Sequence, residues 1–488
     1  MQKQIQKTRK LALKIKSKSR LLMKYYIKRV LQIIILSFVT ILSFAQQSIY
    51  TIDAFLTSIK KNHPVAKQAN IIVNKASAEI QSAKGSFDPL LELDALQKTF
   101  DGKNYYQYSS PELKIPTNLP LDIKTGFETN DGLYLNPEYS KGKSSYIGVE
   151  IALAKGFMID KRRAALQQTK ILFNQSEQEK RIVINNLLFE AYNDYWQWTG
   201  AFKQYKIYNK FLENATTRLR LIKLGFINGE RSEMDTIEAF NQLNSYQLLE
   251  TEALLKLKSC GFQLSTYLWD EQEKPYLLPE SYIPDTLLFA SQLDLIEPVD
   301  YFLTQSNNKS PFIKSYESKI ESLNIEKKLK FQNLLPYFNV KANVLSKGYY
   351  EPKKMDGAYF EKNYKWGFDF KMPLLFREGR GEYSKAKLKI KEANLELAYK
   401  KCQIENKIRY YHTEINLLQQ QLNTMLSIYS NSVLLLKNEE LKFAQGESTL
   451  FLINSRENKV LEVAQKQIDL TVKYKKAKYA VDWVAGLL

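Results

Sequence analysis

The chain has 488 residues, of which 44% are hydrophobic and 25% charged, so it can build a large core and is not a disordered tail. Its 18 Gly and 14 Pro exclude a collagen-like or low-complexity chain and favour long uninterrupted elements. The formal net charge of +19 is uneven, because residues 1–45 carry eight Lys, three Arg and no acidic residue. The mixed-sign remainder argues against a nucleic-acid-binding protein.

The first segment has the features of a secretory signal peptide. A basic stretch ending at Arg29 precedes an apolar run from Val30 to Phe44, and small residues occupy the cleavage positions of Ser43-Phe44-Ala45. A transmembrane anchor is the alternative, but this run of about fifteen residues is shorter than the ~20 that span a bilayer. We therefore predict a signal peptide over residues 1–45. If the exported chain enters a membrane, it does so as strands of a closed barrel.

The rest of the chain contains an internal duplication. Pro64 and Pro89 are separated by the same interval as Pro311 and Pro336, and each pair encloses a helix-like stretch followed by an alternating segment. We predict a first repeat over residues 46–269, a proline-rich linker over 270–308 and a second repeat over 309–488.

Each repeat contains two alternating segments, which predict strands at about residues 89–100, 144–155, 336–347 and 363–374. In the second of these, Ile147 and Val149 share one face and Gly148 and Glu150 the other. This alternation is typical of transmembrane β-strands, and also of a soluble sheet with one solvated face. Four strands cannot close a water-filled barrel, so several chains would have to contribute to one. We expect residues 101–143 to form a large outward loop and residues 348–362 a smaller counterpart.

Two long helical hairpins are predicted at about residues 160–268 and 380–485, with tips at 224–235 and 443–452. Their apolar positions alternate in steps of four and three, which is a coiled-coil seam. Sixty helical residues would extend roughly 90 Å. The seam positions are Ile184, Leu188, Ala191, Tyr195, Trp198, Phe202 and Tyr205, then Ile404, Ile408, Tyr411, Ile415, Leu418, Leu422, Met425 and Tyr429.

The turn segments Gly229–Ala239 and Gly446–Glu457, together with Phe87-Asp88-Pro89, resemble the TolC-type outer membrane factors over about residues 50–488. The resemblance implies a mainly α fold with transmembrane β, four strands per chain, in a homotrimer. Twelve strands would cross the outer membrane lipid and twelve helices would form a periplasmic α-barrel. Its partners would be a periplasmic adaptor of the membrane fusion protein class and an inner-membrane RND or ABC pump. The sequence departs from the family in its long first outer loop and its few tip carboxylates in the second repeat.

The function implied is a passive exit duct of a tripartite efflux or type I secretion system, in the cell outer membrane with a periplasmic extension. The rival interpretations are a soluble periplasmic coiled-coil scaffold and an intracellular nucleic-acid-binding coiled coil.

The tips hold the candidate functional residues. Charged side chains there could form inter-chain ion pairs that close the pore, or could be ordinary helix-start acids stabilised by the helix dipole. These gating candidates are Glu230, Arg231, Glu233, Asp235, Glu447 and Arg456. We expect Gly225, Gly229 and Gly446 to form the turns and to expose backbone to the adaptor. The strand-to-helix junctions are basic, at Lys161, Arg162, Arg163, Arg377 and Arg380, and could meet anionic headgroups.

No pattern for catalysis, nucleotide binding or a cofactor occurs, so we predict that the protein is not an enzyme. His63 and His412 are far apart in sequence, and surface or packing roles are expected for them rather than a metal site. Cys260 and Cys402 would lie at heights along their hairpins that differ by roughly 20 Å, too far for a disulfide.

Overall fold

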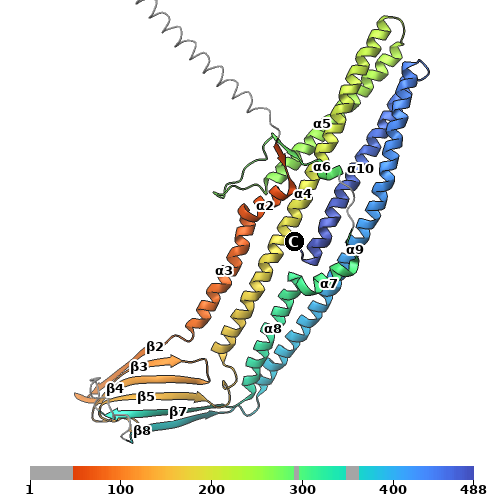
Figure 1. The fold of residues 1–488 in the computed structure, drawn as a ribbon. Helices are drawn as coiled ribbons and strands as arrows, with labels where there is room; N and C mark the ends of the chain where they lie inside the picture. The colour runs from red at the N-terminus through yellow and green to blue at the C-terminus, as the bar shows by residue number, and fades with distance from the viewer. Residues whose placement is uncertain (1–47, 291–295, 348–361) are drawn as a thin grey trace, which may run out of the picture. The chain divides into compact units, whose positions relative to one another are not determined.

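The computed structural model describes residues 48–290, 296–347 and 362–488 (Figure 1). The predicted signal peptide and almost all of the predicted loop 348–362 lie outside these residues. The described chain forms two compact units. The first comprises residues up to Phe55, Trp198–Thr266 and Tyr276–Ser291, and the second comprises Leu56–Gln197, Tyr267–Pro275 and Gln292–Leu488.

The first unit contains the larger part of one helical hairpin. Helix α4 (Lys161–Ile227) enters it at Trp198 and is followed by α5 (Glu233–Ser265). The buried positions of α5 recur every seven residues, at Ala239, Tyr246, Ala253 and Cys260. This spacing keeps one face of a helix in contact with its partner along a coiled coil. The short strand β1 (Ser48–Tyr50) pairs in parallel with β6 (Tyr282–Pro284), and α6 (Leu287–Ala290) follows.

The helices of the second unit include a complete hairpin of its own. They are the second part of α2 (Ile52–Asn62), α3 (Pro64–Gly85), the first part of α4, α7 (Val299–Lys309), α8 (Pro311–Phe331), α9 (Arg377–Ala444) and α10 (Leu450–Ala485), with a 3₁₀ turn at Gln332–Leu334. The seam predicted on α9 forms part of the hydrophobic core of this hairpin. Its residues Ile404, Ile408 and Ile415 are buried in one cluster with Leu470 and Tyr474 of α10. The predicted long antiparallel hairpin is confirmed.

The end of α10 packs against the part of α4 that belongs to the second unit. Trp483 stacks on Phe189 with ring centroids 4.3 Å apart, and its Nε1 donates a hydrogen bond of 2.8 Å to Oδ1 of Asn186. Tyr479 stacks on Tyr192 in the same way. The C-terminal helix of the second repeat is therefore anchored to the first repeat by stacked rings.

A six-stranded antiparallel sheet lies in the second unit, in the order β2-β3-β4-β5-β7-β8. The strands are β2 (Leu90–Phe100), β3 (Lys103–Pro116), β4 (Leu121–Asp131), β5 (Gly142–Ala152), β7 (Tyr337–Lys347) and β8 (Tyr364–Lys371). Four of them, β2, β5, β7 and β8, lie over the segments predicted as strands. The predicted fold class, long helical hairpins with an antiparallel sheet, is confirmed.

The prediction of four strands per chain was wrong, because β3 and β4 form where a large loop was expected over residues 101–143. Of that segment, only residues 101–102, 117–120 and 132–141 lie outside the strands. The physical reason is that β4 alternates like the other strands, with Ile123 and Phe127 on one face and Lys124 on the other. Turn-forming residues such as Pro111 and Gly126 made the segment resemble a loop. A sheet accepts them where the ladder is interrupted or where a side chain needs room.

Gly126 is an example, because it leaves space for the side chain of Tyr146. A Cβ atom at this position would lie 2.7 Å from the carbonyl oxygen of Pro111 and 2.8 Å from the hydroxyl of Tyr146. The buried Tyr146 ring occupies the space that a side chain at residue 126 would fill. The glycine is therefore a packing residue of the sheet and not a loop residue.

Candidate channel residues

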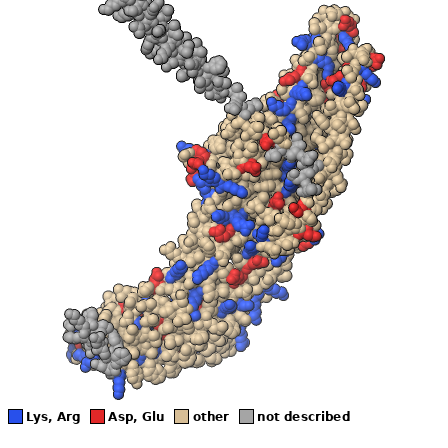
Figure 2. Space-filling view, viewed as in Figure 1, with Lys and Arg blue, Asp and Glu red and all other residues tan. Residues whose placement is uncertain are grey.

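The sheet has one apolar face that is widely exposed. On β8, the side chains of Trp366 and Phe368 are 67% and 61% exposed, and Tyr364 and Phe370 lie on the same face. The strand register continues this face through Val340 on β7 and Ile147 on β5. In Figure 2 the visible surface around the sheet carries few charged side chains compared with the helices. Exposed contiguous apolar surface of this kind marks a contact with lipid or another protein.

The opposite face of the sheet carries a ladder of charged and polar side chains. Nζ of Lys124 on β4 lies 2.9 Å from Oε2 of Glu150 on β5 and 3.9 Å from Oε1 of Glu112 on β3. Oε1 of Glu150 accepts a hydrogen bond of 3.1 Å from Nδ2 of Asn339 on β7. Lys341 of β7 then pairs with Asp369 of β8 at 2.8 Å. The ladder thus crosses the sheet from β3 to β8, and it satisfies the charges on a face that can be hydrated.

The junction between β5 and α4 is tied to the start of β4 by an ion pair. Nη2 of Arg162 lies 2.9 Å from Oδ1 of Asp122 at the start of β4, and Nε of Arg163 lies 3.2 Å from Oδ2 of Asp160. Two of the basic residues predicted at this junction, Arg162 and Arg163, therefore have acidic partners within the chain. They offset the unfavourable position of cations at a helix start.

The tip between α4 and α5 is built around a left-handed glycine. Gly229 has φ +78°, and its N–H donates to the carbonyl of Phe226, while the N–H of Glu230 donates to the carbonyl of Gly225. These two bonds form a Schellman motif, which satisfies carbonyl groups at a helix end. Gly225 is therefore the last-turn acceptor of α4, and Gly229 is the turn residue that was predicted.

Asp235 closes the start of α5. Oγ of Ser232 accepts a hydrogen bond of 3.1 Å from the N–H of Asp235, and Oδ2 of Asp235 accepts one of 3.2 Å from the N–H of Ser232. This reciprocal pair is a capping box. Glu230 and Glu233 are exposed at the same tip, whereas Arg231 is half-buried.

The second tip repeats this turn with a different set of charges. Gly446 has φ +81°, and the N–H groups of Gly446 and Glu447 donate to the carbonyls of Phe443 and Lys442. Oγ1 of Thr449 caps α10 by accepting from the N–H of Leu452, so leucine stands where the first tip has Asp235. The duplication therefore preserves the backbone of the turn and changes its carboxylates.

Arg456 lies beside Glu439, an acidic residue that was not among the predicted site residues. Its Nε lies 3.6 Å from Oε2 of Glu439 on α9, and Oε1 of the same carboxylate accepts a 2.6 Å hydrogen bond from Ser448. The Glu439 side chain is only 13% exposed. Within the hairpin, Arg456 thus ties α10 to α9. The pairing of tip charges between chains stays a prediction.

We expect Asp235→Ala to destabilise the first hairpin by about 0.5–1.5 kcal/mol, because it removes the side-chain acceptor of the Ser232 N–H in the capping box. Asp235→Asn removes the charge but keeps an oxygen that can accept the N–H of Ser232, and so serves as the matched variant. If the residue acts only as a cap, thermal unfolding will show a lower stability for Asp235→Ala and little change for Asp235→Asn. If its charge closes a pore, both variants will raise conductance.

Other titratable groups have structural partners. Nδ1 of His63 accepts the N–H of Val65 at the start of α3, and Nε2 of His412 lies 3.2 Å from the carbonyl oxygen of Glu297. On α9, the hydrogen bond from Lys330 of α8 lowers the pKa of the Glu382 carboxyl. Among the described residues, no cluster of His, Cys, Asp or Glu has the arrangement of a metal site. Cys260 is buried and Cys402 is exposed, and neither forms a disulfide.

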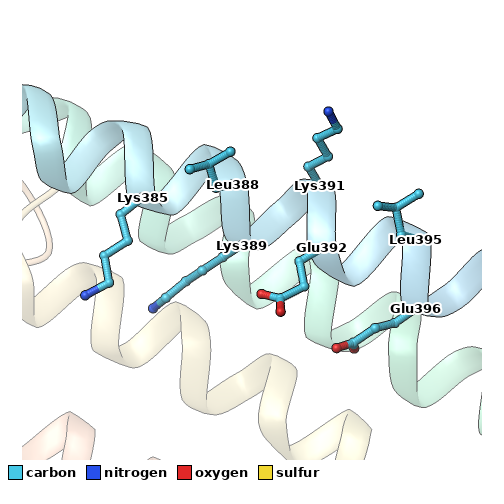
Figure 3. A pocket seen from close by; sticks show the side chains of 7 residues that line it. All are labelled: Lys385, Leu388, Lys389, Lys391, Glu392, Leu395 and Glu396. Carbon is cyan, nitrogen blue, oxygen red and sulfur yellow. The ribbon is translucent and has the colours of Figure 1, made fainter.

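Helix α9 carries an open groove of about 720 Å³ along one side (Figure 3). Lys389 and Glu396 pair with Glu326 and Lys319 of α8. Leu388 and Leu395 also line the groove and lie seven residues apart. Their side chains point away from those of Lys389 and Glu396 and are 63% and 64% exposed. This is a second apolar heptad stripe, outside the core seam. In the described segments, no helix is both long and apolar enough to cross a bilayer.

No family model and no curated protein matches the sequence. Solved structures do match. The CmeC outer membrane channel of Campylobacter jejuni aligns with a TM-score of 0.61 and 17% identity over 89% of this chain and 85% of that chain. The outer membrane protein VceC of Vibrio cholerae aligns with a TM-score of 0.61 and 13% identity over 89% and 96%. The open-state MtrE outer membrane channel of Neisseria gonorrhoeae aligns with a TM-score of 0.62 and 11% identity over 89% and 88%. The chain therefore has the fold of these outer membrane channels, the fold that its resemblance to TolC-type factors predicted.

Proposed function

We propose that the protein is an outer membrane channel, the passive exit duct of a tripartite efflux or type I secretion system. The observation that carries the proposal is the six-stranded sheet, which exposes aromatic and aliphatic side chains on one face and a charged ladder on the other. In a membrane barrel the first face contacts lipid and the second lines water. The similarity of fold to outer membrane channels supports the same assignment.

The two edges of the sheet support assembly as a homotrimer. Within the described sheet, β2 and β8 each pair with a single strand, so each leaves a row of backbone groups open. Because the strands alternate in direction and their number is even, β2 and β8 run in opposite directions. The β8 strand of one copy can then pair antiparallel with β2 of the next, and a ring of copies removes every open edge.

The helices offer matching surfaces for neighbouring copies. Leu248, Leu255 and Phe262 form an exposed stripe on α5 at seven-residue spacing, like that of Leu388 and Leu395 on α9. Such stripes pack well against other helices and poorly against water. We infer that they are the inter-subunit seams of a periplasmic tunnel.

The tips are the proposed gate and the docking point for a periplasmic adaptor. Glu230, Glu233 and Glu447 are exposed beside the left-handed turns of Gly229 and Gly446, so both charge and backbone are available there. Transport would work by movement of the tips and not by bond chemistry, with energy supplied by an inner-membrane RND or ABC pump.

Recording of single channels from the purified protein in a planar bilayer tests the proposal. We expect discrete conductance steps, which Glu230→Ala and Asp235→Ala increase if the tip charges hold the pore shut. Protein that stays in the soluble periplasmic fraction and gives no conductance, even with both substitutions, would favour a coiled-coil scaffold instead.

A further inference from the structure

The hairpin β3–β4 is inserted into the middle of the sheet and not attached to its end. Its first strand pairs with β2 from Leu90↔Lys114 to Phe100↔Lys103, and its second pairs with β5 from Leu121↔Ile151 to Asn130↔Gly142. Strands β2 and β5 are therefore separated along their whole length. If the hairpin were only an extension of an outer loop, β2 and β5 would still pair with each other over at least part of that length.

Both faces of the sheet continue through the hairpin. Leu113, Ile115 and Ile123 lie on the face of Ile147 and Phe368, while Glu112, Lys114 and Lys124 lie on the face of Glu150 and Asp369. The hairpin also supplies two of the three charges in the Glu112–Lys124–Glu150 part of the ladder. A segment outside the bilayer would have no need for an apolar face in register with that of its neighbours.

The dimensions of the hairpin fit a bilayer. Strands β3 and β4 have 14 and 11 residues, like the 11 residues of β2, β5 and β7, and a transmembrane strand needs about 9–11. Pro111 interrupts the pairing with β4 between Ser109 and Glu112, and the ladder resumes in the same register. The turn from Thr117 to Pro120 is short, and Arg162 of α4 ties the strand that follows it to the helix junction.

We propose that β3 and β4 are membrane-spanning strands whose apolar face contacts lipid, so that three copies close an eighteen-stranded barrel instead of a twelve-stranded one. The inference rests on the proposed function, which supplies the trimer and the membrane. Because barrel diameter grows roughly linearly with strand number, the pore through the membrane would be about 1.5 times as wide as that of twelve strands. The charges of the hairpin would then line the pore, together with those of β5, β7 and β8.

Fluorescence quenching from within the bilayer tests the placement of the hairpin. In the full chain with Cys260→Ser and Cys402→Ser, single cysteines are introduced at Ile123, Val149 and Glu128 and labelled with a polarity-sensitive fluorophore. Ile123 and Val149 are register partners on adjacent strands, so Val149→Cys is the matched control on a strand of the predicted set. Glu128→Cys reports the opposite face of β4. The protein is reconstituted in phosphatidylcholine vesicles with and without lipid that carries a nitroxide on its acyl chain.

We expect labelled Ile123→Cys and Val149→Cys to lose a similar fraction of their emission and labelled Glu128→Cys to keep its emission. In a parallel sample without the fluorophore, Glu128→Cys should react with a water-soluble thiol reagent. Quenching at Val149→Cys without quenching at Ile123→Cys would overturn the eighteen-stranded barrel and leave the proposed function intact. If neither Ile123→Cys nor Val149→Cys is quenched, the result contradicts both the proposed function and the inference. Ile115→Cys, on the same face of β3, provides the same measurement if Ile123→Cys does not fold.

Discussion

Phe368→Arg is expected to abolish or strongly reduce insertion of the assembled channel. Phe368 lies near the middle of β8 on the apolar face and is 61% exposed, so in the proposed barrel it contacts lipid. Arginine on the lipid face costs about 2–4 kcal/mol at the bilayer midplane. A ring of three copies would carry this cost three times. The measurement is the amount of heat-resistant trimer in the outer membrane fraction, with single-channel recording of whatever is recovered.

The matched control is Gly367→Arg, which introduces the same charge one residue away on the opposite face. A Cβ atom at Gly367 meets nothing within 4 Å, and the residue lies on the charged face, where the carboxylate of Asp369 two residues along can balance an arginine placed opposite Lys341. The variant should therefore assemble. Equal recovery of the two arginine variants would contradict a lipid-facing role for the aromatic side of β8.

Ile415→Ala is expected to cause a large loss of stability in the second hairpin. The Ile415 side chain is fully buried in the cluster that joins α9 to α10. Truncation of a buried isoleucine to alanine costs about 2–5 kcal/mol, through lost burial and the cavity that remains. Thermal unfolding of the purified protein, followed by circular dichroism at the helical band, measures the effect.

Ile428→Ala makes the same chemical change on the same helix at a position that is 41% exposed. We expect it to shift the unfolding temperature much less, because water already covers part of that side chain. Similar shifts for the two variants would mean that the α9–α10 seam does not dominate the stability of the hairpin.

The candidate site was only partly predictable from the sequence. The glycine turns at both tips were predicted, because a left-handed residue leaves a recognisable pattern at a helix end. The partners of the charges were not. Glu439 is seventeen residues from Arg456 and on the other helix, and Glu150 is twenty-six residues from Lys124 and on the next strand. Pairs of this kind depend on hairpin length and strand register, which local patterns do not specify.

The sequence by itself determined which face of each helix or strand is apolar. The seven-residue spacing around Ile408 and Ile415 is a property of one helix, and the alternation around Ile147 is a property of one strand, so both are visible without a partner. Only the tertiary structure decided that residues 103–131 join the sheet. The alternation of β4 was present, but strand formation there depends on hydrogen bonds to β3 and β5 and on the space that Gly126 leaves for Tyr146. A strand is stabilised by its neighbours, and a helix mainly by its own backbone, so the added strands were the feature that sequence reasoning missed.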